Sequence, residues 1–499
     1  MTDNDPAEDV LATLRALRAA DPPTHGGRVL SYVYDSGRAD LDRVAAEAAE
    51  LFLPVNGLDP TTFTSVGVLE RDLVAFGRSV LHGGSDVVGS VTSGGTESCL
   101  LAVKSARDRA RATGGGARLA LVLPTSAHPA FRKAAAYLGL DLVEVPVDPG
   151  TGAVHAPDLL AALDDVAAAG GRVALAVVSA PSYPSGAVDP VEDVAVGCAA
   201  RGVDLHVDAC VGGLVLPWWP HDLPPWDFRV PGVTSMSADL HKYGFVPKGA
   251  SLVLYRGRDR HLAQYFATSS WPGYPVVNPT ALGSRSAVGM AAAWAVVRTL
   301  GEDGYADLVA RTAQATDHVR SALRDVPGLR VLGDPVGPLL AVVADEEAGP
   351  DMRVDPFLLV DAVRARGFLL QAQPAFPQPD GTVVPRSAHL TLTPVTLGVA
   401  EELVAALAAG ASAVRGRPTP QPDPTLVERV AAEGLPAELA PVMATLEALP
   451  REHSPALLAQ LLAAVVDPDR GQPGPHALAR GEEHGAHGPS AAPPGTTVR

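Results

Sequence analysis

The chain is poor in cysteine and carries fewer cationic than anionic residues. Its three cysteines are Cys99, Cys198 and Cys210, an odd number and too few for a disulfide framework, so a reducing cytosol is expected. The formal net charge of −17 argues against nucleic acid or an anionic membrane as a partner, because both select dense clusters of Lys and Arg.

A secretory signal and a membrane anchor are also not apparent. The start, Met1-Thr2-Asp3-Asn4-Asp5, is acidic and lacks the basic-then-apolar order of a signal peptide. No apolar run approaches the roughly 20 residues of a membrane helix, and the run from Ala287 to Val297 has the length of a core helix. We therefore expect a cytoplasmic protein without membrane insertion.

With 499 residues, of which 47% are hydrophobic and 19% charged, the chain fits a globular protein of two or three domains. The predicted divisions are an N-terminal segment (1–60), a large domain (61–300) and a small C-terminal domain (301–415). A proline-rich linker with a helical extension (416–466) and a disordered tail (467–499) follow.

Short apolar runs alternate with helical patterns through the large domain. The predicted strands are 118–123, 140–145, 172–179, 203–208, 233–237 and 251–255, and the predicted helices between them are 96–113, 128–138, 157–169 and 190–201. Strands that are apolar throughout indicate a mostly parallel sheet covered by helices on both faces.

Four motifs lie at or just past predicted strand ends, where ligands of such sheets bind. They are Thr92-Ser93-Gly94-Gly95-Thr96-Glu97-Ser98, Ser126-Ala127-His128, His206-Val207-Asp208-Ala209-Cys210 and Ser237-Ala238-Asp239-Leu240-His241-Lys242-Tyr243-Gly244. A glycine-rich loop before a helix can bind phosphate, and a buried carboxylate requires a cationic partner. A lysine at an element end can form a Schiff base if burial or a nearby cation keeps it unprotonated, and His241 and Lys248 are such neighbours in sequence. Together the motifs suit a pyridoxal phosphate enzyme.

Each motif alone has a plainer interpretation. A lysine at a turn is usually solvated, and a carboxylate ending a strand often caps a helix or joins a structural ion pair. His128 alone would be a partly buried helix cap. The combination, in this order, favours the enzyme.

The order and wording of the motifs resemble the sphingosine-1-phosphate lyase branch of the group II pyridoxal-dependent decarboxylases, from about Gly26 to about Gly410. The resemblance implies an α/β protein of the fold-type-I, aspartate aminotransferase-like class. This class has a large domain with a mostly parallel seven-stranded sheet and a smaller C-terminal α/β domain. It also implies pyridoxal phosphate as cofactor and a homodimer with shared active sites.

The resemblance further implies a role for individual residues. Lys242 would form the Schiff base, Asp208 would pair with the pyridinium nitrogen, His128 would stack on the ring, and the segment with Gly283 and Ser284 would reach the cofactor phosphate from a second subunit. The implied catalytic residues are Lys242 and Tyr183. The implied cofactor-binding residues are Gly94, Gly95, Thr96, His128, Asp208, Ala209, His241, Lys242, Gly283 and Ser284, and the implied substrate-binding residues are Tyr34, Asn56, Asp59 and Lys248. No metal site is expected.

Two positions depart from the family pattern. Asp59 stands where the lyases carry a histidine that helps to bind the substrate phosphate, and Ser185 replaces a histidine frequent after Tyr-Pro. An anion beside a phosphate costs affinity, unless Asp59 is paired with Lys248 or Arg28.

The sequence therefore predicts a carbon–carbon lyase that cleaves a phosphorylated, sphingoid-like amino alcohol by retro-aldol chemistry, with Tyr183 or Lys242 as the base. An L-amino acid decarboxylase is the alternative, but the decarboxylases carry an arginine in a late strand, and here the strand at 389–393 has only Arg386 nearby. A pseudoenzyme that only binds the cofactor is the third possibility.

Overall fold

The computed structural model describes residues 6–114, 116–423, 425–426, 436, 438–450 and 454–468. The chain forms two compact units, of which one, Pro23–Asp423 with Ala437–Glu447, contains the seven-stranded and the four-stranded sheet. The described helices of the other unit are α1 (Pro6–Ala19) and α14 (Ser454–Val465). The expected helical extension 416–466 is therefore divided, since α13 (Ala440–Ala448) lies almost wholly in the first unit. The expected disordered tail falls almost entirely outside the described residues.

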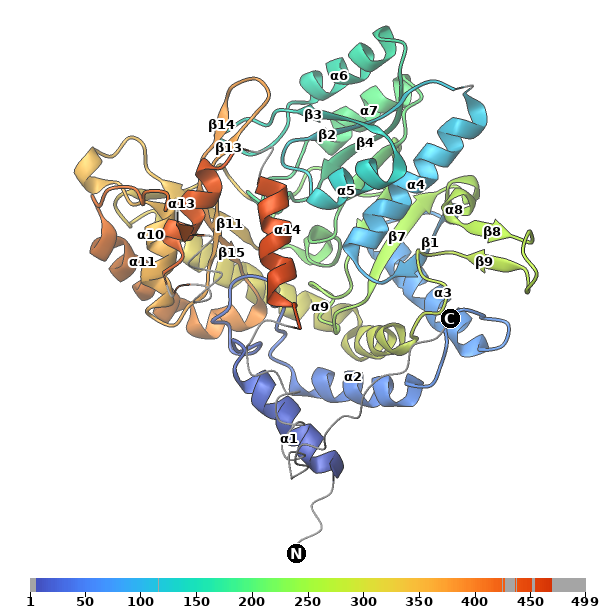
Figure 1. Cartoon of the computed structure of the whole chain (residues 1–499), viewed down its shortest axis with the longest axis horizontal. Coiled ribbons are helices and arrows are strands. Elements are labelled where there is room, and N and C mark those ends of the chain that lie inside the picture. Colours follow the sequence, from blue (N-terminus) through green and yellow to red (C-terminus); the bar gives the residue numbers. More distant parts are fainter. Residues whose placement is uncertain are drawn as a thin grey trace, which may run out of the picture. The chain divides into compact units, whose positions relative to one another are not determined.

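The large domain is built on a seven-stranded sheet of order β1-β7-β6-β5-β4-β2-β3 (Figure 1). Its strands are β1 (Val87–Thr92), β2 (Leu119–Pro124), β3 (Asp141–Val145), β4 (Arg172–Ser179), β5 (Leu205–Asp208), β6 (Val233–Ala238) and β7 (Ser251–Arg256). Only β7 runs antiparallel to its neighbours β1 and β6. This confirms the mostly parallel sheet, and it adds β1, which sequence patterning did not identify.

The strands are buried on both faces because neighbouring side chains point into two different cores. In β4, Leu175 and Val177 pack under α4 and α5, whereas Ala176 and Val178 belong to the core on the other face. The helices of this domain are α3 (Thr64–Val80), α4 (Gly95–Thr113), α5 (Pro129–Leu138), α6 (Ala156–Ala168), α7 (Val191–Ala200) and α8 (Arg258–Gln264). Two covered faces explain why the strands read as continuous apolar runs.

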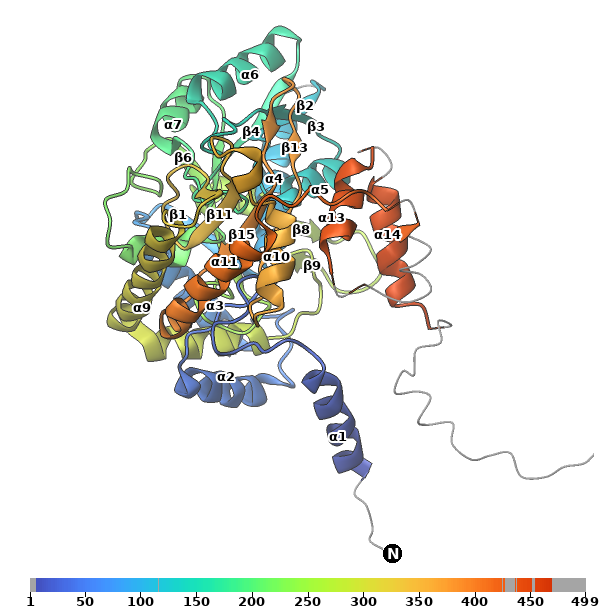
Figure 2. The same cartoon turned by 90° about the vertical axis from the view of Figure 1, so that its left-hand side faces the viewer.

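A smaller antiparallel sheet of order β10-β11-β15-β12 forms the second domain. Its strands are β10 (Leu329–Val331), β11 (Leu339–Ala344), β12 (Gln371–Gln373) and β15 (Ser387–Thr391), and α10 (Pro356–Arg364) and α11 (Ala400–Val414) pack beside each other on it (Figure 2). Two short hairpins, β8 (Phe266–Thr268) with β9 (Val276–Asn278) and β13 (Phe376–Pro377) with β14 (Val383–Val384), complete the strands.

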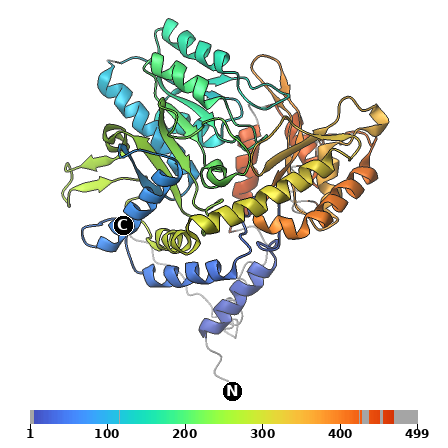
Figure 3. The same ribbon diagram turned by 180° about the vertical axis from the view of Figure 1, so that it is seen from behind.

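One helix joins the two domains. Helix α9 (Val288–Leu323) contacts α2 (Ala39–Phe52) and α3 with its first part and α11 and β10 with its second, and it bends at Gly301 (Figure 3). The φ of +58° at Gly301 lies in the left-handed region that favours glycine, so the bend occurs where the sequence permits it. The predicted boundary at residue 300 lies at this bend.

One helical stretch reaches membrane length, contrary to the expectation that none does. The 21 residues Pro394–Val414 are long and apolar enough to cross a bilayer. In the structure Leu403, Leu407 and Ala411 of this stretch are buried in the core of the small domain. The stretch is therefore a core helix here, because its apolar side faces α10 and α9.

A buried histidine makes the stability of the large domain depend on pH. His206 of β5 is bonded to Ser235 and Ser237, and burial lowers its pKa to about 4. Below pH 6.5 the unfolded chain takes up a proton that the folded chain refuses, so this contribution to stability is lost as pH falls from about 6.5 to about 4. At pH 5 the loss from this one group should be about 2 kcal/mol relative to pH 7.5.

We expect His206→Gln to remove that part of the pH dependence, as measured by reversible urea unfolding of the cofactor-free protein at the two pH values. The exposed His155 provides the control, and His155→Gln should leave the pH dependence unchanged. Equal pH dependence in His206→Gln and wild type would contradict the assignment.

Candidate active site

Lys242 lies in a tight turn directly after β6, at the carboxyl edge of the sheet. Its amide donates to the carbonyl of Asp239, and its Nζ lies 2.9 Å from Asp239 Oδ2. Burial alone lowers the pKa of Lys242, but the Asp239 carboxylate opposes this and the pKa ends well above its ordinary value. In the cofactor-free protein Lys242 is therefore paired with a carboxylate, a partner that the sequence pattern did not indicate.

Asp239 is a functional residue that the sequence motif contained but its pattern did not single out. Its side chain is 1% exposed, and its Oδ1 has no hydrogen-bond partner among the described residues. A Cβ added to Gly95 would lie 2.7 Å from both Asp239 oxygens and from Cys210 Sγ. The glycine-rich loop and the lysine turn therefore touch, and Gly95 is required by close approach rather than by backbone conformation.

Asp208 ends β5 as a buried, ionised carboxylate. Both Cys210 N–H and Ser237 O–H donate to its Oδ1, at 3.1 and 3.0 Å, and no described residue donates to Oδ2. Burial raises the pKa of Asp208. The electrostatic effects of His128, His206 and Lys242 and a hydrogen bond with the Cys210 side chain lower it by a larger amount, so the net pKa is below its ordinary value. Such a carboxylate suits a pyridinium N–H, as expected. Ala209 beside it is fully buried.

The loop between β1 and α4 has the form expected of a phosphate site. Gly94 and Gly95 precede the helix, Thr96 is exposed in its first turn, and Thr92, Ser98 and Ser251 form a chain of buried hydroxyls beneath it. Glu97 is turned away from this site, accepting from the backbone of Ser93 and Ala281. Backbone N–H groups and the helix N-terminus are therefore left for an anion.

Two histidines border this space. His128 caps α5, with its Nδ1 accepting from Ala130 N–H at 3.2 Å, and burial lowers its pKa while the charges of Asp208 and Lys242 act on it in opposite senses. His241 lies against the glycine loop, 3.2 Å from a Cβ added to Gly94, and burial lowers its pKa as well. Both predicted residues thus lie beside the glycine loop and the two carboxylates, and His128 also plays the capping role of the plainer interpretation.

A pocket that contains Lys248 opens beside the lysine turn. Lys248 Nζ donates to the His241 carbonyl at 3.1 Å and lies 4.5 Å from the Tyr34 ring centroid. Burial, reinforced by Lys242, lowers the pKa of Lys248 to about 8, and burial raises that of Tyr34 to about 12. Tyr34, His241 and Lys248 help to line a cavity of about 450 Å³. At neutral pH the pocket presents an ammonium and a phenol together with the carboxylates of Asp35 and Asp42.

Tyr183 follows β4 and contacts the small domain. Its ring lies 4.2 Å from that of His389, and its hydroxyl donates to Gln371 Oε1 at 2.6 Å. Burial raises the pKa of Tyr183 well above its ordinary value, so the group remains a phenol. Gln371 was not identified from the sequence, because no motif marks it and 188 residues separate it from Tyr183.

Asn56 and Ser284 meet each other at the surface. Asn56 Nδ2 donates to Ser284 Oγ at 3.3 Å, and a Cβ added to the exposed Gly283 would have no neighbour within 4 Å. Arg285 is occupied by Glu70 at 2.6 Å and by the carbonyls of Gly57 and Val91. Gly283 and Ser284 are therefore exposed on their own chain.

Asp59 is also exposed, and its partners are not the expected cations. Its carboxylate accepts from Thr61 and Thr62, which lower its pKa to about 2. Arg28 pairs instead with Glu402. The alternative in which Asp59 pairs with Lys248 or Arg28 is therefore wrong, because the threonines that follow Asp59 satisfy its carboxylate locally.

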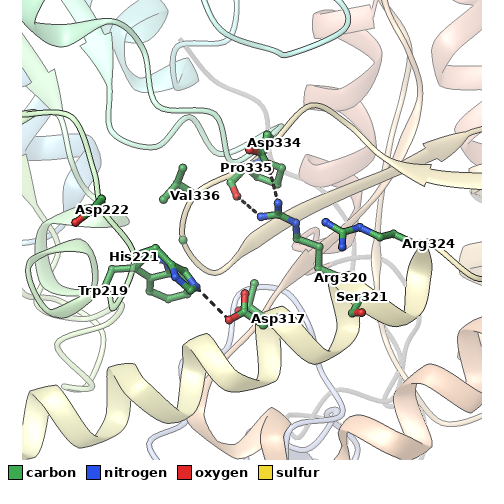
Figure 4. Close-up of a pocket in the computed structure, with 12 residues that line it drawn as sticks. Trp219, His221, Asp222, Asp317, Arg320, Ser321, Arg324, Asp334, Pro335 and Val336 are labelled. Carbon is green, nitrogen blue, oxygen red and sulfur yellow. Dashed lines mark hydrogen bonds and ion pairs between the residues drawn. The ribbon is translucent and has the colours of Figure 1, made fainter.

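A separate cavity of about 510 Å³ lies between the loop at Trp219, helix α9 and the β10–β11 connection (Figure 4). In it His221 lies 3.1 Å from Asp317, and Arg320 pairs with Asp334. None of the predicted site residues lines this cavity.

Removing the Asp239 charge should lower the pKa of Lys242. We expect Asp239→Asn to shift the midpoint of covalent pyridoxal phosphate attachment to lower pH by at least one unit, because the amine loses its anionic partner while remaining buried. The measurement is cofactor absorbance against pH, starting from cofactor-free protein. An unchanged midpoint would mean that the pair does not control the amine.

The geometry agrees with three comparisons to known proteins. The profile of the pyridoxal-dependent decarboxylase conserved domain matches residues 69–340. A sphingosine-1-phosphate lyase of Oryza sativa subsp. japonica is 33% identical over 83% of this chain and 74% of its own length, and one of Dictyostelium discoideum is 32% identical over 79% and 70%. The solved structure of a Burkholderia pseudomallei sphingosine-1-phosphate lyase has 31% identity and a TM-score of 0.76, over 94% of this chain and 96% of that chain. A Lactobacillus brevis glutamate decarboxylase, 20% identical with a TM-score of 0.69, shares the fold.

Proposed function

We propose that this chain, which belongs to the pyridoxal-dependent decarboxylase family and is a pyridoxal phosphate-dependent lyase, cleaves a carbon–carbon bond in a long-chain amino alcohol phosphate. The observation that carries the choice of substrate is the distribution of cations. Lys248 remains accessible beside the lysine turn, whereas Arg386, the candidate to orient a substrate carboxylate, is consumed by Asp355 at 2.7 Å and by Glu447.

The residues present fit the cofactor. The loop with Gly94, Gly95 and Thr96 would hold its phosphate, Asp208 its ring nitrogen and His128 its ring face, and Lys242 would attach it covalently. When bound, the cofactor withdraws electrons from the carbon that bears the amine. The proton of the substrate hydroxyl must be removed for cleavage. Because burial raises the pKa of Tyr183, we give Tyr183 a hydrogen-bonding role. We assign removal of the proton to Lys242, whose amine must be unprotonated in order to hold the cofactor.

The activity is tested by incubating the purified enzyme with a phosphorylated sphingoid base, its unphosphorylated form and a panel of L-amino acids. We expect long-chain aldehyde from the phosphorylated amine, at least tenfold less from the unphosphorylated one, and no carbon dioxide. Lys242→Ala should lose both covalent cofactor and turnover. Lys248→Gln should raise KM for the phosphorylated amine by about tenfold or more, since it removes a charge-assisted contact.

Release of carbon dioxide from an amino acid, with no aldehyde, would instead establish the decarboxylase. Bound cofactor without turnover of any amine would establish the pseudoenzyme.

We also propose a cytoplasmic homodimer with shared sites. In support, Phe266, Trp271, Tyr274 and Val277, on and between β8 and β9, and Leu282 nearby are exposed hydrophobic residues. A contiguous apolar surface of this kind is typical of subunit interfaces. Gly283 and Ser284 follow directly, exposed and ready to reach a neighbouring site.

Mixing two inactive variants tests the shared site. Lys242→Ala lacks the amine, and Ser284→Glu places a carboxylate where the cofactor phosphate of the neighbouring subunit would lie. If sites are shared, a mixed dimer contains one site with both native residues, so co-refolded or co-expressed variants should recover up to half of the wild-type activity per mixed dimer. No recovery despite verified mixed dimers would place Ser284 in the site of its own chain.

A further inference from the structure

A single cross-strand pair of the small domain holds Tyr183 at two points. Gln371 of β12 and His389 of β15 are directly opposite each other in the antiparallel pairing. His389 lies against the ring of Tyr183, and Gln371 accepts from its hydroxyl. The position of this large-domain tyrosine is therefore set by the small domain.

Gln371 also holds a second tyrosine. Its Nε2 donates to Tyr32 Oη at 2.6 Å, so one amide bridges two phenols. Tyr32 has a φ of +63°, in the left-handed region that is costly for an aromatic residue, while its side chain is 66% exposed. A strained backbone that serves an exposed side chain yields no packing benefit, which suggests that the hydroxyl has a use.

The amide fixes the hydrogen-bond direction of each phenol. Tyr183 commits its proton to Gln371 Oε1, so the lone pairs of Tyr183 are presented elsewhere as an acceptor. Tyr32 accepts from Gln371 Nε2, so its own proton is free to be donated. One side chain thereby creates an acceptor and a donor side by side, which is the complement of an alcohol.

The two phenols belong to the active-site region. The charge of Lys242 and the hydroxyls of Tyr34 and Tyr32 all act on Tyr183, and Tyr32 and Tyr34 line the same cavity as Lys248. A substrate whose amine lies near Lys242 and whose phosphate lies at Lys248 would therefore lie in the region of these phenols.

We propose that Gln371 is a specificity-determining residue: by orienting Tyr183 and Tyr32 it selects substrates with a hydroxyl on the carbon next to the amine-bearing carbon. In the bound substrate, before Lys242 removes the proton, the hydroxyl oxygen accepts a hydrogen bond from Tyr32 and the hydroxyl donates one to Tyr183. This rests on the proposed function for the identity of the substrate. An analogue without the hydroxyl cannot make either of these hydrogen bonds, and sites built to hydrogen-bond a substrate hydroxyl discriminate against analogues that lack it.

The test compares the binding of two phosphorylated long-chain amines, one with that hydroxyl and one without it, by titrating the absorbance of the bound cofactor. We expect wild type to bind the hydroxylated amine about tenfold or more tightly, and Gln371→Leu to bind both within about threefold. Gln371→Glu should also lose most of the preference, because a carboxylate makes Tyr32 donate inward.

Gln373→Leu is the matched control. Gln373 lies two residues further along β12 and accepts from Ser387 at 2.7 Å, so its loss removes a comparable hydrogen bond away from the phenols. This variant should keep the wild-type preference. Melting temperatures of the variants separate loss of folding from loss of selectivity.

Two outcomes would overturn the inference: a preference that survives in both Gln371 variants, or equal weakening of both amines, which would give Gln371 a merely structural role. Because the readout is binding, the inference stands or falls even if wild type releases carbon dioxide from amino acids and the proposed cleavage is wrong. A wild type with no preference for the hydroxylated amine would also refute it.

Discussion

The buried pair of Asp239 and Lys242 is the interaction around which the site is organised. A carboxylate that is 1% exposed requires a cation, and removing one member of a buried pair costs about 3 to 5 kcal/mol because the other charge is left unpaired. The pair therefore fixes the turn after β6, and the turn fixes the amine. Gly95 has no side chain because the Asp239 carboxylate fills the space that a Cβ would occupy.

This pair also links the two halves of the cofactor site. The Cys210 thiol and the Asp239 carboxylate both lie against Gly95, and the backbone N–H of Cys210 donates to Asp208. The carboxylate proposed for the cofactor ring and the carboxylate that pairs with Lys242 are therefore both close to Cys210. The strand ends of β1, β5 and β6 meet here because parallel strands bring their carboxyl ends to one edge. The site residues between positions 94 and 242 are thus brought together by the order of the strands in the sheet and not by the local sequence.

The parts that the sequence could predict are those with local signals. The run 172–179 is β4 as predicted, since an apolar, β-branched octamer between glycine and a proline-rich turn has few alternatives. Lys242, Asp208 and the glycine loop were identified because their motifs are contiguous. The contacts of Gln371 and the ion pairs of Arg386 could not be predicted from the sequence. They join segments that are 31 to 339 residues apart and leave no local pattern. The alternative of an ion pair between Asp59 and Lys248 or Arg28 failed for the opposite reason: the hydrogen bonds of Asp59 to Thr61 and Thr62 are local and satisfy its carboxylate.

Reaction choice in this fold follows from which cations remain unpaired near the amine. Decarboxylation requires a fixed positive group for the substrate carboxylate, and the chain spends Arg386 on closing α10 against α13 through Asp355 and Glu447. Lys248 is held differently, by a carbonyl and an aromatic face, neither of which neutralises its charge. A carboxylate partner neutralises a cation, so that the cation can no longer bind a substrate anion. A carbonyl or an aromatic ring only positions the cation and leaves its charge available to the substrate. By that criterion the anion that this site is built to receive is at the far end of the substrate, near Lys248, and not on the carbon beside the amine.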